Sequence, residues 1–96
     1  MKIPKSIPCA SHEFTCRFIK NLIRDRACRG EVVFTTQEVN LDDTLEGTTL
    51  AVVFWHEVLH IIDRHYCNES TDENDIASLA EGLAQVMKSI GITFER

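Results

Sequence analysis

Long apolar runs are missing from this sequence. No stretch reaches the roughly eighteen apolar residues that a membrane-spanning helix needs, and the longest, residues 50–55, ends at His56 and Glu57. The basic residues 1–5 are not followed by the apolar segment of a signal peptide. We therefore expect a cytoplasmic protein without a membrane partner.

Positive charge is also scarce. The chain has ten lysines and arginines against fifteen aspartates and glutamates, which gives a formal net charge of −5 at pH 7. Proteins that bind nucleic acids usually carry a basic surface, and basic segments also mediate attachment to anionic membranes. The composition therefore argues against both kinds of partner.

Cysteine pairs with the C-x-x-C spacing are absent, so a cysteine-rich structural zinc site is weakly supported. The four cysteines stand apart, at Cys9, Cys16, Cys28 and Cys67. Nothing else indicates an oxidising compartment, and we expect free thiols. Internal repeats and low-complexity segments are missing as well. The 96 residues therefore predict one domain, 1–96, with a single modest core.

The first half of the chain has the patterns of β-strands. Apolar residues alternate with polar ones over residues 12–19, which predicts a half-buried strand. A later segment rich in β-branched side chains predicts two short strands, 31–35 and 37–42, or one irregular strand. Two prolines favour an edge strand or an irregular arm over residues 1–11. We expect the charged segment 20–30 to be a polar connection with a helical turn and a solvated basic face.

The second half predicts two helices. A strongly apolar segment indicates a largely buried helix at about 45–66. Apolar residues at spacings of three and four predict an amphipathic helix at about 72–90. The expected fold class is therefore α+β, with a small antiparallel sheet of about three to four strands packed on an active-site helix and a C-terminal helix.

Residues that favour helix ends flank both helices. Asp43 or Thr44 is expected to cap the start of the first helix, and Ser70 or Thr71 the start of the second. Gly91 fits the position just after the end of the second helix, where a left-handed backbone is common. These positions define the expected ends of the two helices.

Residues 56–60 read H-E-x-x-H within the apolar helix. Residues four apart lie on the same face of a helix, so His56 and His60 are placed to hold one metal ion, with Glu57 beside them as a base. Polar groups on a buried helix must be paired or bound to something. The alternative is a pair of hydrogen-bonded core histidines beside an exposed glutamate.

A catalytic zinc ion needs three protein ligands and an open position. The best candidate for the third ligand is Glu73, in the first turn of the second helix and on its apolar side. A carboxylate there is unusual unless it is paired, and the alternative is a capping box with Ser70. Asp72 and then Glu69 are the next candidates.

Two further roles need residues near the motif. Asp63 shares the metal-facing side of the helix and is predicted to accept a ring N–H from His60 or to anchor the loop before the second helix. A plain helix-end carboxylate is the alternative. Peptide hydrolysis also needs a donor to the oxyanion, for which Tyr66, His65 and His12 are candidates that the sequence alone does not place.

The two motifs resemble those of zincin-like metallopeptidases whose third ligand is a glutamate. Residues 56–63 resemble the pattern H-E-x-x-H-x-x-D, and residues 73–83 the pattern E-x-x-I-x-x-L-A-x-x-L, of small phage and prophage proteins. The second segment is also similar to the E-x-x-A-x-x-F-A helix of ImmA/IrrE-like peptidases. The metzincin arrangement differs, because it requires glycine and histidine where this chain has Asp63 and Tyr66. The resemblance covers about residues 31–90.

The resemblance implies a zinc ion bound by His56, His60 and Glu73, with Glu57 as the general base. The expected function is a zinc metallopeptidase that acts on a protein or peptide, in the host cytoplasm if the chain is encoded by a phage. A second hypothesis is a binding protein on the same scaffold that engages a host or phage protein and cleaves nothing. A structural protein without metal is the third.

Overall fold

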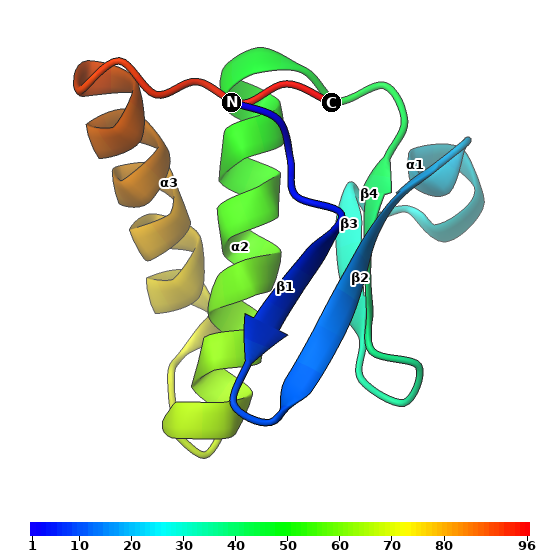
Figure 1. Cartoon of the computed structure of the whole chain (residues 1–96), viewed down its shortest axis with the longest axis vertical. Coiled ribbons are helices and arrows are strands. Elements are labelled where there is room, and N and C mark those ends of the chain that lie inside the picture. Colours follow the sequence, from blue (N-terminus) through cyan, green and yellow to red (C-terminus); the bar gives the residue numbers. More distant parts are fainter.

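In the computed structural model, which describes residues 1–96, a four-stranded sheet packs on one long helix and a second helix covers another side of the first (Figure 1). The strands are β1 (Ser6–Cys9), β2 (His12–Ile19), β3 (Gly30–Val33) and β4 (Glu38–Asp42). The helices are α1 (Leu22–Arg26), α2 (Gly47–Tyr66) and α3 (Glu73–Ser89). The α+β class is confirmed, and both long helices lie close to their predicted ends. None of the helices combines the length and the apolar character needed to cross a membrane.

The sheet is mixed, in the order β1-β2-β4-β3. β1 pairs antiparallel with β2 and β3 antiparallel with β4, while β2 and β4 join the two pairs in parallel. The prediction of an antiparallel sheet is therefore wrong at its centre. After β2 the chain forms α1 and β3 before it reaches β4. β4 therefore runs in the same direction as β2 and pairs with it in parallel. Side-chain alternation specifies which face of a strand is buried, and it carries no information about the direction of the partner.

One face of the sheet forms the core together with α2. Apolar side chains from both meet in a single cluster that includes Phe14, Val39, Leu41, Leu50, Val53, Phe54 and Ile61. α3 packs on another side of α2 through the small residues Ala80 and Ala84, which allow the two helices to approach closely. α2 therefore lies between the sheet and α3 (Figure 1). This position explains why the helix is apolar around most of its circumference.

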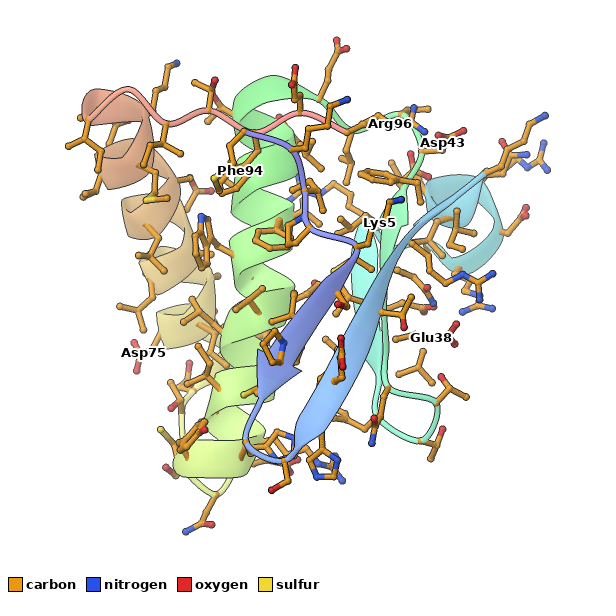
Figure 2. The ribbon with its side chains drawn as sticks, in the orientation of Figure 1. Lys5, Glu38, Asp43, Asp75, Phe94 and Arg96 are labelled. Atoms are coloured by element: carbon orange, nitrogen blue, oxygen red, sulfur yellow. The ribbon has the colours of Figure 1, made fainter.

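α2 begins without the expected side-chain cap. Its N-cap residue is Glu46, whose side chain makes no capping hydrogen bond. Thr44 donates its hydroxyl and its N–H to the carboxylate of Asp42, and Asp43 pairs with Arg96 near the end of the chain (Figure 2). The predicted cap by Asp43 or Thr44 is therefore wrong, because both residues serve the turn between β4 and α2.

The start of α3 also differs from the prediction. Asp72 is the N-cap, and its Oδ1 accepts a hydrogen bond of 2.7 Å from the N–H of Asn74. Ser70 donates its hydroxyl to the carbonyl oxygen of Cys67 and so belongs to the preceding loop. The predicted cap by Ser70 or Thr71 is therefore wrong. The alternative role of Glu73, in a capping box with Ser70, is wrong for the same reason.

The end of α3 agrees with the prediction. Gly91 has a φ of 87°, and the N–H of Ile92 donates to the carbonyl oxygen of Met87 at 2.8 Å, which closes the helix with a left-handed turn. The chain then crosses α2, where the ring of Phe94 packs against Phe54 with centroids 5.4 Å apart (Figure 2).

All four cysteines are free, as expected.

Candidate metal centre

The two histidines of the H-E-x-x-H motif lie on one face of α2. The Nε2 atoms of His56 and His60 are 3.1 Å apart. Their side chains are 24% and 30% exposed, so both rings are partly sheltered, and their Nε2 atoms face α3. This arrangement follows directly from the spacing of four residues on a regular helix.

Glu73 brings a carboxylate to the same point from α3. Its Oε1 lies 2.8 Å from Nε2 of His56 and its Oε2 lies 3.1 Å from Nε2 of His60. The Glu73 side chain is 64% exposed, so it reaches over the histidines from the surface and is not buried in the helix interface. The predicted juxtaposition of these three residues is thus present in the structure.

The short connection between α2 and α3 holds Glu73 in position. The buried carboxylate of Asp63 accepts a hydrogen bond of 3.1 Å from the N–H of Thr71. The backbone oxygen of Asp63 also accepts from the N–H groups of Cys67 and Glu69. Of the two roles predicted for Asp63, the structure assigns the anchoring of this loop. Two residues after Thr71 the chain reaches Glu73, so the anchor helps to fix the approach of this carboxylate to the two histidines.

The geometry of the three side chains fits a metal ion. Zn–N bonds of about 2.0–2.1 Å in a tetrahedral site place neighbouring ligand atoms roughly 3.3 Å apart. The ligand atoms of His56, His60 and Glu73 all lie within 4.8 Å of one another, and the closest pairs are 2.8 to 3.1 Å apart. Two imidazoles and a carboxylate suit zinc and other divalent transition metals. Three protein ligands also leave a position for water.

The other candidates for the third ligand are engaged elsewhere. Asp72 caps α3, as described above, and Glu69 forms an ion pair of 3.1 Å with Arg64. The capping box that would occupy Glu73 is not formed, because Ser70 bonds within the loop. Glu73 is therefore the carboxylate that joins the two histidines.

Glu57 lies beside the histidines on the side of α2 that faces the sheet. It is only 7% exposed, and burial raises the pKa of its carboxyl to about 7, with smaller contributions from the negative charges of Glu73 and Glu31. A cation held by His56 and His60 opposes this shift, because it favours the carboxylate. A carboxyl group with a pKa near neutrality accepts and returns a proton readily.

Glu57 and His56 line a pocket of about 170 Å³ together with residues from the start of β3. The full lining is Arg29, Gly30, Val52, Val53, His56 and Glu57. A side chain at Gly30 would not fit, because its Cβ would lie 2.7 Å from Cγ1 of Val53 and 3.3 Å from Cγ of Glu57. Sequence reasoning missed this contact, although glycine in a strand is a known signal of close backbone approach.

None of the three predicted oxyanion donors lines the pocket beside Glu57. The hydroxyl of Tyr66 accepts a hydrogen bond from the N–H of Ala10 in the turn between β1 and β2. The rings of His12 and His65 stack on each other with centroids 4.9 Å apart, and Nδ1 of His12 is 2.9 Å from Nε2 of Gln37. These contacts join the tip of the first hairpin to the end of α2.

Comparisons with the models of known protein families, with curated proteins and with solved structures find no match. What this centre does must therefore be argued from its own geometry and chemistry.

Proposed function

We propose that this protein is a zinc-dependent metallopeptidase. The observation that carries the proposal is the convergence of His56, His60 and Glu73 beside the buried carboxyl of Glu57. Two histidines and a glutamate form the ligand set of a catalytic zinc site, which differs from a closed structural site in leaving one position open. An acid–base group next to that position is what amide hydrolysis requires.

In this proposal His56, His60 and Glu73 hold the ion, which when bound supplies a water molecule of lowered pKa and polarises the scissile carbonyl. Glu57 accepts a proton from the attacking water as the oxygen of that water forms a bond with the carbonyl carbon. Glu57 then gives the proton to the amide nitrogen as the C–N bond breaks. The immediate products are a carboxylic acid and an amine, Glu57 returns to its starting state, and transfer of the acid's remaining proton to the amine gives a carboxylate and an ammonium group.

The edge of the sheet supports a peptide as the substrate. β3 is the last strand in the order of the sheet, so one of its edges has no partner strand. Gly30 at its start lies against Glu57. An extended peptide can add to such an edge through main-chain hydrogen bonds. We propose that the substrate lies along β3, which brings one of its peptide bonds to the pocket beside Glu57.

A second candidate function is a zinc-loaded binding protein that cleaves nothing. The pocket beside Glu57 has a volume of only about 170 Å³, whereas ligand pockets are usually roughly 300–1,000 Å³. So small a pocket encloses little of a substrate, which favours a protein that binds its partner over a larger surface. The two functions differ in what they require of Glu57. Hydrolysis depends on its carboxyl group, whereas a binding protein tolerates an amide at this position.

The first experiment measures metal content and Glu57-dependent cleavage on the same preparations. The wild type is expected to bind one equivalent of zinc, and His56→Ala/His60→Ala to bind none. Glu57→Gln is expected to keep its zinc and lose cleavage of a peptide library. Glu81→Gln, an exposed change on α3, is the matched control and is expected to match the wild type.

Less than half an equivalent of zinc in the wild type, or undiminished zinc in the double histidine variant, contradicts the metal centre. Full zinc occupancy with cleavage that does not depend on Glu57 contradicts the mechanism. Zinc binding without any cleavage, together with a stable complex with an intact protein partner, favours the binding protein.

A further inference from the structure

Arg29 differs from the other arginines of the chain in its electrostatic surroundings. There are six arginines, and five of them form an ion pair with a carboxylate. These pairs are Arg17 with Glu38, Arg24 with Asp25, Arg26 with Glu31, Arg64 with Glu69 and Arg96 with Asp43. Arg29 has neither an ion pair nor a side-chain hydrogen bond. In a chain with a net charge of −5, an arginine without a carboxylate partner is notable.

This unpaired arginine lines the pocket beside Glu57 and His56. Arg29 shares the lining with His56 and Glu57. Its backbone is fixed, because its carbonyl oxygen accepts a hydrogen bond of 2.8 Å from the N–H of Asp42 at the end of β4. The next residue, Gly30, lies directly against Glu57. The guanidinium group therefore extends from a fixed point next to the acid–base residue.

The chemistry of the pocket matches an anionic oxygen. An arginine side chain is always protonated and offers five N–H donors in a planar fork. Two other carboxylates near the pocket already have partners: Glu73 contacts the two histidines, and Glu31 pairs with Arg26. Arg29 forms no ion pair with Glu57 or with any other carboxylate, so its guanidinium group is free to bind a negative oxygen of a ligand in this pocket.

We propose that Arg29 binds the negatively charged oxygen of a peptide-derived ligand at the metal centre, and that in the reaction this oxygen is the oxyanion formed from the scissile carbonyl. The proposal rests on the proposed metallopeptidase function and gives it an oxyanion donor in the pocket beside Glu57, which Tyr66, His65 and His12 do not line. Charge-assisted hydrogen bonds to an oxyanion form at the point of the reaction where charge develops, so they lower the barrier selectively. Arg29 is in this role a catalytic residue.

Ligand binding tests the proposal without requiring turnover. The protein is loaded with Co²⁺, and binding is followed by the visible absorption of the ion. Three probes are compared: a capped tripeptide phosphonate that carries a tetrahedral anion in place of the scissile carbonyl, planar acetate, and neutral imidazole. Arg29→Ala is expected to weaken phosphonate binding by about tenfold to a hundredfold, the scale for loss of a charge-assisted hydrogen bond, and to leave imidazole binding unchanged. Arg29→Lys is expected to lose less, because it keeps the charge.

Arg24→Ala is the matched control, since Arg24 is exposed on α1 and pairs with the neighbouring Asp25. It is expected to bind all three probes like the wild type. Metal content and thermal midpoint of Arg29→Ala are measured alongside and are expected to be unchanged. Acetate distinguishes a substrate carboxylate from the oxyanion of the reaction as the group that Arg29 binds. A loss confined to phosphonate assigns Arg29 to the oxyanion, and an equal loss for acetate assigns it to a substrate carboxylate and overturns the catalytic role.

The outcomes separate this proposal from the function on which it rests. Unchanged phosphonate binding in Arg29→Ala, or an equal loss for phosphonate and imidazole, overturns the role of Arg29 while the metal centre stands. Failure of the wild type to bind the ion overturns both proposals. Arg29-dependent phosphonate binding without Glu57-dependent cleavage retains the anion site and contradicts the peptidase.

Discussion

Glu73 Oε1 lies 2.8 Å from Nε2 of His56, although the two residues belong to different helices. The same carboxylate contacts His60 through its other oxygen at 3.1 Å. A glutamate that joins two imidazoles in this way is positioned as a ligand to an ion between them, and the first prediction concerns its removal.

Loss of a residue that only hydrogen-bonds to a metal ligand typically weakens metal binding roughly 10- to 100-fold. Glu73→Ala is expected to weaken zinc binding by more than this, because it removes a proposed ligand itself. Competition with a chromophoric chelator measures the affinity. Glu81→Ala on the same helix is the control, since Glu81 is exposed. Equal zinc affinity of Glu73→Ala and the wild type would show that Glu73 is not a ligand.

Asp63→Ala is expected to lower both stability and zinc affinity. It leaves the N–H of Thr71 without its acceptor, and an unsatisfied buried donor costs about 1–3 kcal/mol. The loop that carries Glu73 loses its anchor at the same time. Denaturant unfolding and chelator competition give the two values. Asp75→Ala is a matched control, because Asp75 points away from α2 (Figure 2). A stability loss with unchanged zinc affinity would separate the anchor from the metal site.

Gly30→Ala is expected to destabilise the protein by about 1–3 kcal/mol, the usual range for overpacking. The added Cβ would lie 2.7 Å from Cγ1 of Val53 and would press on Glu57. Gly82→Ala is the matched control, because a Cβ at Gly82, within α3, meets no atom within 4 Å. That change is expected to stabilise by about 0.5–1 kcal/mol through helix propensity. Denaturant midpoints measure both, and equal effects of the two changes would contradict the close contact at Gly30.

Stability is expected to fall in acid partly through Asp42. Hydrogen bonds from the Thr44 hydroxyl and from the N–H groups of Ile23 and Thr44 hold the pKa of the Asp42 carboxyl below its ordinary range. A lowered pKa in the folded state means that the carboxylate stabilises the protein above the unfolded pKa of about 3.9, and that this contribution disappears as the pH falls through the folded value.

Asp42→Asn separates this carboxylate from the others. The difference in thermal midpoint between the wild type and Asp42→Asn is expected to be greatest above about pH 4 and to shrink as the pH falls further, since both then carry a neutral side chain. Thermal unfolding between pH 6 and pH 2 measures it. A difference that stays constant across this range would exclude the titration of Asp42 as its cause.

Prediction from the sequence succeeded where local periodicity carries the information. The alternation over residues 12–19 and the apolar segment before Tyr66 are confirmed as β2 and α2. The predicted helix caps were wrong. Asp43, Thr44 and Ser70 each have other polar partners within reach, and local preference does not determine which partner a side chain binds. The sheet direction failed for the related reason that pairing of β2 with β4 is a contact between distant segments.

The sequence by itself determined that His56 and His60 share a face and that Glu57 stands beside them, because helix geometry converts a spacing of four residues into proximity. Only the tertiary structure decided the remainder of the centre. The placement of Glu73 depends on the loop that Asp63 anchors, and the placement of Arg29 depends on the approach of β3 to α2. Both arise from packing between elements distant along the chain, which the spacing of residues does not specify.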